Sequence, residues 1–247
     1  MESVERLTLK FCKDIMKKQD GHLNLSWFTK PFMLPNQLKV KKSFNLSGSG
    51  ITELPINLKV KGDFLISNTQ INKLPCGLKV NGILDCSHTS IDSIPEDIYI
   101  EKGIYFSHTK ITKLPNNIRY VKGNLELQSS MIKELPQNLT VIGDLNLSDT
   151  PIKELPKGIY VGGNLILTNS QVEKLPEGLC VGSNLLLQNT PIKKLPEGMK
   201  IENSLKLQDT KITALPQFLK VGAYLDISYL GIVDIPKGVE VGLGVIK

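Results

Sequence analysis

Histidine and acidic side chains supply the first pattern in this sequence that could do chemistry. His88 and His108 occupy the same place in two successive repeats, and Asp85 and Asp149 stand at nearby places of the pattern. Imidazole and carboxylate are both zinc ligands, but a zinc site needs at least three protein ligands. Two histidines in expected turns are weak evidence, so we expect no metal and no cofactor.

The cysteines offer no catalytic or redox motif. They lie too far apart for a CxxC motif and are too few for a secreted disulfide scaffold: Cys12, Cys76, Cys86 and Cys180. We find no nucleophile with a matching base and acid, no phosphate-binding glycine loop and no pair of glutamates at a cleft. Glycines after the prolines, such as Gly158 and Gly178, are typical of turns. These features favour a non-enzymatic protein of a reducing, cytoplasmic compartment, either of the producing cell or of an infected host cell.

The charge of the chain permits acidic partners without selecting one. Formal net charge is +6, and charges run through the first twenty residues, which excludes a secretory signal or a membrane span there. Lysines recur in two columns of the repeat: Lys39, Lys59, Lys79, Lys200 and Lys220 in one, and Lys73, Lys113, Lys174 and Lys194 in the other. Acidic residues interrupt these stripes (Glu134, Glu154, Glu173 and Asp234), and no aromatic stacking platform accompanies them. Solvation is the favoured role, and binding of nucleic acid or an anionic surface is an alternative function.

A repeat of about twenty residues positions all of these side chains. A proline recurs once in each unit, at Pro35, Pro55, Pro75, Pro95, Pro115, Pro136, Pro156, Pro176, Pro196, Pro216 and Pro236. Each unit follows P-x-x-L-x-V-x-G-x-L-x-L-S-x-T-x-I-x-x-L, and the single longer step places one extra residue near Tyr120 and Val121, which indicates a local bulge. Because one coil cannot bury its own apolar edge, successive coils must stack on one another.

Two aliphatic columns define the expected core. One holds Ile51, Ile71, Ile91, Ile111, Ile132, Ile152, Val172, Ile192, Ile212 and Ile232, and the next holds Leu54, Leu74, Ile94, Leu114, Leu135, Leu155, Leu175, Leu195, Leu215 and Ile235. The L-x-L dyads, such as Leu145 with Leu147, predict a short strand in each coil. Proline excludes an ordinary helix from L-P-x-x-L, so we expect extended or 3₁₀ structure there, with L-x-V as a candidate second strand.

A column of hydroxyl side chains follows each dyad, where the chain turns inward. It contains Thr69, Thr89, Thr109, Ser130, Thr150, Ser170, Thr190 and Thr210. A buried hydroxyl here can bond the backbone of its own or the next coil. We interpret the column as a structural hydroxyl ladder rather than a catalytic one.

The motif L-x-L-x-x-T-x-I-x-x-L-P-x-x-L resembles the leucine-rich repeat, over residues 35–247. The short period with L-P is similar to repeats of bacterial type III effectors of the YopM and IpaH kind, and to repeat proteins of bacteriophages. Thr or Ser stands where that family usually has Asn, and Gly143 or Gly163 stands near its first leucine. The resemblance implies a protein-binding scaffold. IpaH-like effectors add a ubiquitin-ligase domain with a catalytic cysteine, for which no residues remain after the last repeat, and Cys86 occupies a core leucine position.

We therefore predict a leucine-rich-repeat solenoid, mainly β, with one parallel sheet of about ten short strands and an extended or 3₁₀ convex side. An N-terminal α-helical cap is expected over residues 1–34, with the solenoid over 35–247. Ser3 is the expected N-cap of a helix of about four turns that carries Val4, Leu7, Phe11, Ile15 and Met16. The aromatic and apolar residues expected to complete the cap by covering the first coil are Trp27, Phe28, Phe32 and Met33.

The C-terminal coil departs from the pattern. Leu230 replaces the hydroxyl, Tyr224 and Tyr229 appear nearby, and the chain closes on VEVGLGVIK without a polar cap. An open sheet edge favours pairing with another molecule, so a homodimer through this edge is a further hypothesis, and a self-associating structural protein is a second alternative function.

The outward positions of the strands are the expected binding surface for another protein. Aliphatic and aromatic side chains there need no exposure for folding, and they stand among carboxylates, amides and a lysine. Neutral drift on a solvated sheet is the competing interpretation. The predicted partner-binding residues are Leu65, Ile83, Asp85, Tyr105, Glu126, Asn146, Ile166, Leu186, Lys206, Tyr224 and Asp226.

Overall fold

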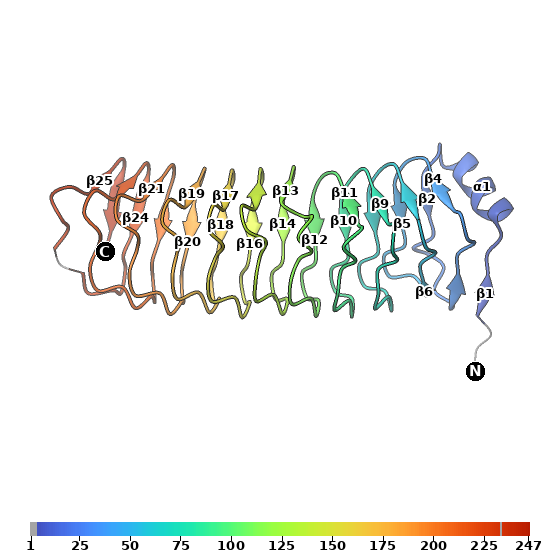
Figure 1. The fold of residues 1–247 in the computed structure, drawn as a ribbon, viewed down its shortest axis with the longest axis horizontal. Coiled ribbons are helices and arrows are strands. Elements are labelled where there is room, and N and C mark those ends of the chain that lie inside the picture. Colours follow the sequence, from blue (N-terminus) through green and yellow to red (C-terminus); the bar gives the residue numbers. More distant parts are fainter. Residues whose placement is uncertain (1–3, 233) are drawn as a thin grey trace. The chain divides into compact units, whose positions relative to one another are not determined.

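The computed structural model describes residues 4–232 and 234–247, and the chain divides into two compact units, residues 1–117 and 118–247. Each unit is a solenoid of short parallel strands, as the repeat predicts (Figure 1). The leucine-rich-repeat architecture is therefore confirmed, with one short helix near the N-terminus of the first unit.

Over its described residues, 4–117, the first unit contains one helix and three small parallel sheets. Its elements are β1 (Glu5–Arg6), α1 (Leu9–Lys18), β2 (Leu23–Asn24), β3 (Phe32–Met33), β4 (Lys39–Val40), β5 (Phe44–Asn45), β6 (Ile51–Glu53), β7 (Lys59–Val60), β8 (Phe64–Leu65), β9 (Lys79–Val80), β10 (Leu84–Asp85), β11 (Tyr99–Ile100) and β12 (Ile104–Tyr105). The dyads form one sheet in the order β2-β5-β8-β10-β12, which we call the L-x-L sheet. The L-x-V segments form a second sheet, β11-β9-β7-β4, called the L-x-V sheet, and β1-β3-β6 is the third.

The second unit repeats the same two sheets. Its L-x-L sheet comprises β14 (Leu125–Glu126), β16 (Leu145–Asn146), β18 (Leu165–Ile166), β20 (Leu185–Leu186), β22 (Leu205–Lys206), β24 (Tyr224–Asp226) and β26 (Gly244–Ile246). Its L-x-V sheet comprises β13 (Tyr120–Val121), β15 (Thr140–Val141), β17 (Tyr160–Val161), β19 (Cys180–Val181), β21 (Lys200–Ile201), β23 (Lys220–Val221) and β25 (Glu240–Val241). The candidate second strand of each coil is thus confirmed.

The core lies between the sheets and contains the predicted isoleucine column and most of the predicted leucine column, of which Leu54, Ile94 and Ile235 are only half-buried. Every member of the isoleucine column is buried, from Ile51 to Ile232. Phe44 and Phe64 stack within the first unit with ring centroids 5.3 Å apart, and Leu145 and Leu165 fill the same column in the second. In the described residues, L-P-x-x-L is extended and leads into a two-residue turn, without 3₁₀ helix.

The predicted N-terminal helix was placed too early. It begins at Leu9, because the Oγ1 of Thr8 accepts a hydrogen bond from the Phe11 N–H at 3.1 Å and caps the first turn. Residues Glu5–Arg6 instead form β1, which pairs in parallel with β3. Ser3, the expected cap, lies outside the described residues.

The capping aromatics divide between core and surface. Phe32 is fully buried, Phe28 and Met33 are half-buried, and Trp27 is 60% exposed. The prediction that Trp27 covers the first coil is therefore wrong. Its indole N–H donates to the Asn24 carbonyl, and its ring centroid lies 5.5 Å from that of Phe28.

The last coil is less covered than the others. Val241 and Val245 are half-buried, and Leu243 and Ile246 are exposed. Self-association through this edge stays a prediction.

Candidate functional site

The outward positions of the L-x-L sheet form a register-locked column in each unit. In the first unit Leu65 pairs with Asp85, and Asp85 with Tyr105. In the second unit the column runs through Glu126, Asn146, Ile166, Leu186, Lys206 and Asp226. Because paired strands lie about 4.8 Å apart, each side chain lies directly against its neighbours in the column.

That side-by-side packing changes the expected exposure. Leu65, Tyr105, Ile166 and Leu186 are half-buried rather than fully exposed, as is Ile83 two residues before Asp85. In the second unit, Ile166 and Leu186 form an adjacent aliphatic pair flanked by Asn146 and Lys206.

Three predicted contact residues also hold their own coils together. Asp85 and Asn146 accept hydrogen bonds from the backbone N–H two residues later, at 2.9 and 3.1 Å. Asp226 does the same for Ser228 and accepts from the Gln208 amide, so it is 9% exposed. Its carboxylate is largely committed within the fold, although it was predicted on the open face.

The pKa of the Glu126 carboxyl is shifted by its position on this face. Burial raises the pKa of its carboxyl above the ordinary value, a hydrogen bond from Asn146 opposes the change, and the charge of Asp144 adds to it.

The preceding outward column is an asparagine and aspartate ladder. The side-chain Oδ1 of Asn124, Asp144, Asn164 and Asn184 each accepts a hydrogen bond from a backbone N–H twenty residues later, at 2.7–3.2 Å. Asp63 does the same for the Ile83 N–H at 2.9 Å. These side chains satisfy backbone donors of the next coil, a role that our sequence reasoning missed although their twenty-residue recurrence was visible.

Five of the eight predicted members of the hydroxyl column bond the backbone as expected, and the other three hydroxyls do not. Thr69, Thr89, Thr109, Thr150 and Thr190 donate their hydroxyl to the carbonyl three residues earlier, at 2.6–2.7 Å. In the coils of Ser49, Ser130, Ser170, Thr210 and Leu230, the backbone N–H of that residue donates to the same carbonyl instead. This second arrangement explains why Leu230 is tolerated, and why the hydroxyls of Ser49, Ser130, Ser170 and Thr210 are buried without a partner.

The histidines lie in the turn that follows each L-x-L strand. His88 and His108 have φ near +56°, as do the Asn, Asp and Ser residues of the same column, and their rings stack with centroids 4.3 Å apart. The carboxylates considered with them are engaged elsewhere, Asp85 with Ser87 and Asp149 with the Asn169 amide at 2.8 Å. Within the described residues, no group of three or more His, Cys, Asp or Glu side chains is placed to hold a metal ion.

The cysteines are free thiols in two environments. Cys12 and Cys86 are buried, and burial raises the pKa of Cys12 to about 11 and that of Cys86 well above its ordinary value. Such thiols stay protonated at neutral pH and are poor nucleophiles. Cys76 and Cys180 are exposed.

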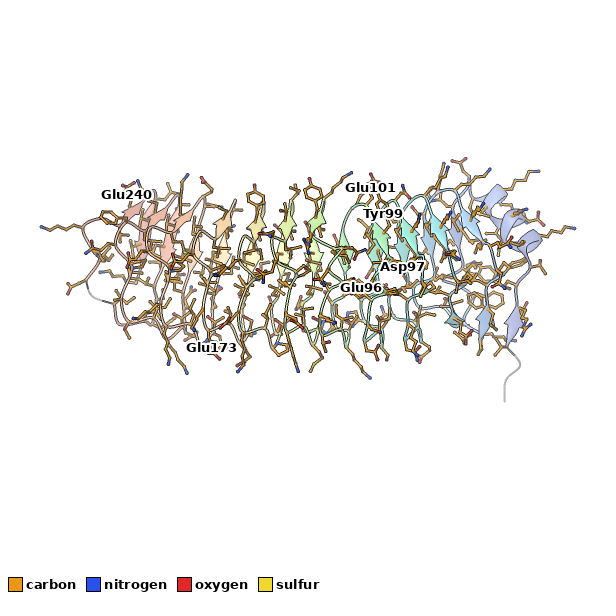
Figure 2. The ribbon with its side chains drawn as sticks, viewed as in Figure 1. Glu96, Asp97, Tyr99, Glu101, Glu173 and Glu240 are labelled. Carbon is orange, nitrogen blue, oxygen red and sulfur yellow. The ribbon has the colours of Figure 1, made fainter. Side chains whose placement is uncertain are left out.

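The lysine columns fall into different electrostatic settings. Lys200 and Lys220 form ion pairs with Glu202 and Glu240, at 2.7 and 3.0 Å. In the first unit, by contrast, Lys39, Lys59 and Lys79 stand in register on β4, β7 and β9, and no acidic partner of theirs occurs among the described residues. Tyr99 takes the next place on β11 and is exposed, beside Glu101 (Figure 2).

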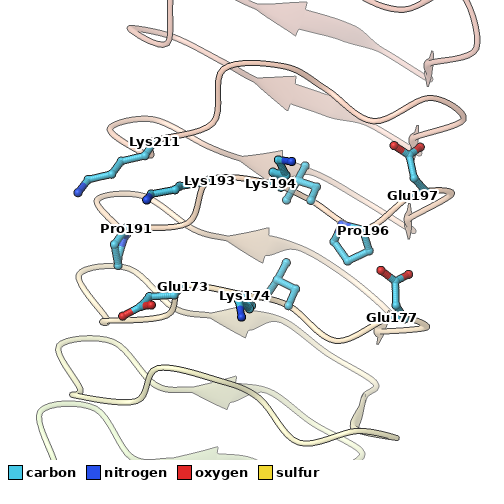
Figure 3. A pocket seen from close by; sticks show the side chains of 11 residues that line it. Glu173, Lys174, Glu177, Pro191, Lys193, Lys194, Pro196, Glu197 and Lys211 are labelled. Atoms are coloured by element: carbon cyan, nitrogen blue, oxygen red, sulfur yellow. The ribbon is translucent and has the colours of Figure 1, made fainter.

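Two grooves border these lysines. A groove of about 800 Å³ in the second unit is lined by side chains of stacked coils: Glu173, Lys174, Leu175, Glu177, Pro191, Lys193, Lys194, Leu195, Pro196, Glu197 and Lys211 (Figure 3). Lysines and glutamates are interspersed along it. A groove of about 950 Å³ in the first unit runs beside α1, β4 and β7, and seven of its eleven lining residues are lysines: Lys13, Met16, Lys17, Asp20, Gly21, Lys39, Val40, Lys41, Lys42, Lys59 and Lys61.

Exposed tyrosines on the L-x-V sheet were also missed. Tyr99 of the first unit, and Tyr120 and Tyr160 of the second, are between 43% and 58% exposed. The L-x-V motif itself marked their position, but its status as a strand was left open.

Comparison with solved structures shows a likeness in fold. No protein-family model matches the chain, and no curated protein matches it. Among solved structures, the chain is similar to YopM, a leucine-rich effector protein from Yersinia pestis, with 17% identity over 96% of this chain and 91% of that chain, and a TM-score of 0.34. Leucine-rich-repeat solenoids are commonly protein-interaction scaffolds. Within the described residues, no helix is long and apolar enough to cross a membrane.

Proposed function

We propose that this protein is a non-enzymatic scaffold that binds a partner protein through the outward column of its L-x-L sheets. The aliphatic pair Ile166 and Leu186 carries the proposal. Both side chains are half-buried by their neighbours alone, and neither contributes to the core columns between the sheets. An apolar centre with a polar rim is the composition of protein interfaces.

The neighbouring columns support the choice of this one. On one side, the asparagine and aspartate ladder is committed to backbone N–H groups of the next coil. On the other, serines such as Ser148 bond back to the strand through Asn146. The middle column is where side chains vary from Glu to Ile to Lys while the coil stays the same, which is how repeat proteins build distinct binding surfaces.

In the first unit, Leu65, Ile83 and Tyr105 supply the same mixture around Asp85. In the second, Glu126, Lys206 and Tyr224 provide the charged and aromatic surroundings of the aliphatic pair. Tyrosine supports an interface because it adds large contact area with few rotatable bonds.

The sequence resemblance extends the proposal to an adaptor or inhibitor acting in the cytoplasm, as a bacterial effector or as a phage-encoded factor that modulates host machinery. The partner is a protein of the cell in which this chain acts.

A pair of matched triple variants tests the proposal. The face variant carries Tyr105→Ser, Ile166→Asn and Leu186→Asn. The control carries three comparable apolar-to-polar changes near the L-x-V sheets, at exposed Tyr99→Ser, Ile142→Asn and Tyr160→Asn. We expect a protein captured from host lysate by the wild type to bind the control equally, and the face variant at least about tenfold more weakly, when the purified pair is titrated. Equal affinity of the face variant would refute the proposal.

A further inference from the structure

The lysine-lined groove of the first unit carries a high positive charge. Seven lysines and one aspartate line it, which leaves a net charge of +6, equal to the formal net charge of the whole protein. The lysines converge from two structures far apart in the sequence: Lys13 and Lys17 come from α1, and the others from β4, β7 and the turns after them.

Little in the described structure neutralises this charge. The aspartate, Asp20, is already ion-paired with Lys42. No acidic partner of Lys13, Lys17, Lys39 or Lys59 occurs among the described residues. The groove of the second unit differs, because four lysines there are interspersed with three glutamates.

The fold does not require lysine at these positions. Lys39, Lys59 and Lys79 face one another in register on adjacent strands, an arrangement of like charges that destabilises a sheet. At the equivalent place in the second unit, three successive paired strands carry Thr140, Tyr160 and Cys180. Lys200 and Lys220 follow them in the same column, but each of these lysines forms an ion pair with a glutamate. The coil therefore folds without lysine at this place, and a bound anion would offset the repulsion among the unpaired lysines of the first unit.

The shape and lining of the groove narrow the class of anion. Its volume of about 950 Å³ lies within the range of small-molecule sites. Lysine ammonium groups bind phosphate as point charges with three donors each. No aromatic or arginine side chain lines the groove. Proteins that bind single-stranded nucleic acid stack its bases on such side chains, so the lining does not favour that class of ligand.

The column of lysines spans only three successive coils of the first unit. After Lys39, Lys59 and Lys79 the fourth strand of the sheet carries Tyr99. The turn position that holds Lys41 and Lys61 becomes Glu101 in the coil of β11. A nucleic-acid backbone would need a longer stripe of positive charge, whereas a compact anion needs only this end of the unit.

We propose that this groove binds a compact, multiply phosphorylated small molecule in solution. The phosphate groups would be held between α1 on one side and the lysines of β4 and β7 on the other. This site is separate from the protein-binding face, so either proposal can fail without the other.

Titration calorimetry with inositol hexakisphosphate as the probe, at physiological ionic strength, tests the site. We expect the wild type to bind one equivalent. The variant Lys17→Gln, Lys39→Gln and Lys59→Gln should lose at least about tenfold in affinity, because charge-assisted hydrogen bonds to phosphate are removed. The matched control Lys174→Gln, Lys193→Gln and Lys194→Gln, in the mixed-charge groove, should stay within about twofold.

Other outcomes would overturn the proposal. Absence of binding by the wild type, or equal loss in the variant and the control, would show that the groove is not a specific phosphate site. Tighter binding of a single-stranded DNA oligonucleotide would show that the ligand of the groove is a nucleic acid. Binding only to vesicles that contain a phosphoinositide would show that it is a membrane surface. Circular dichroism of each variant verifies its fold, and the face variant should bind the probe as the wild type does.

Discussion

The two units of this protein use one coil to build two different grooves. Each unit pairs an L-x-L sheet with an L-x-V sheet around the same aliphatic columns. Yet the groove of the first unit is lined by seven lysines and one aspartate, and that of the second by four lysines and three glutamates. The grooves also lie at different places of the coil, because the first runs beside α1 and the L-x-V strands whereas the second is lined by the segments around the L-P motif. The two units therefore share their core but differ in the place and the charge of their grooves.

The largest expected effect concerns the shared core, and the test asks whether the stability of both units depends on it equally. Phe64 and Leu165 are fully buried in the same column, one in each unit. We expect Phe64→Ala to lower the unfolding free energy by about 3–5 kcal/mol and Leu165→Ala by about 2–5 kcal/mol, because each leaves a cavity between coils. Denaturant unfolding measures both.

Tyr99→Ala is the control for these core variants, since the tyrosine is exposed and its replacement should change stability by about 0.5 kcal/mol or less. A core variant that cost no more than this control would show that its unit is held together by something other than the column.

A second test, with an intermediate expected effect, compares two hydroxyl side chains of the second unit, one that is hydrogen-bonded and one that has no partner. The Thr150 hydroxyl bonds the Leu147 carbonyl at 2.6 Å, whereas the corresponding carbonyl of Leu167 is bonded by the Ser170 N–H at 2.9 Å. Thr150→Val removes a buried hydrogen bond and should cost about 1–2 kcal/mol. Ser170→Ala removes an unpartnered hydroxyl and should be neutral or slightly stabilising. Equal losses in the two variants, measured by thermal unfolding, would contradict this division of the column.

Features that recur in every coil could be predicted from the sequence. The core columns, the dyad strands and the hydroxyl column follow from the twenty-residue period, because register carries each position onto its equivalent in the next coil. The asparagine and aspartate ladder was missed because its role depends on which backbone donors face it from the next coil, which residue type alone does not state. The exposure of Ile166 and Leu186 was overestimated for a related reason, since neighbours about 4.8 Å away cover their flanks.

Features that depend on distant segments could not be read in this way. The helix was started too early because Glu5–Arg6 is drawn into pairing with Phe32–Met33, a contact that no local pattern announces. The lysine groove needs α1 to lie beside β4 and β7, so the stripe of lysines was visible in the sequence while the groove was not. The candidate protein-binding residues were found by periodicity, but their binding role stays a prediction.

The smallest expected effect is a change in stability when one lysine of the first unit is replaced. If the lysines of the first unit are retained for a ligand, removing one should stabilise the ligand-free protein. Lys59 stands between Lys39 and Lys79, so Lys59→Thr relieves two like-charge contacts and should raise the unfolding free energy by about 0.2–1 kcal/mol at low salt. The gain should vanish near 0.5 M salt, where the Debye length falls to a few ångströms. Thr140→Lys in the second unit is the reciprocal control, because its paired neighbours are Tyr120 and Tyr160 and no salt-dependent change is expected. A loss of stability in Lys59→Thr at low salt would mean that the lysine ladder supports the fold, and the argument for a bound anion would lose its main premise.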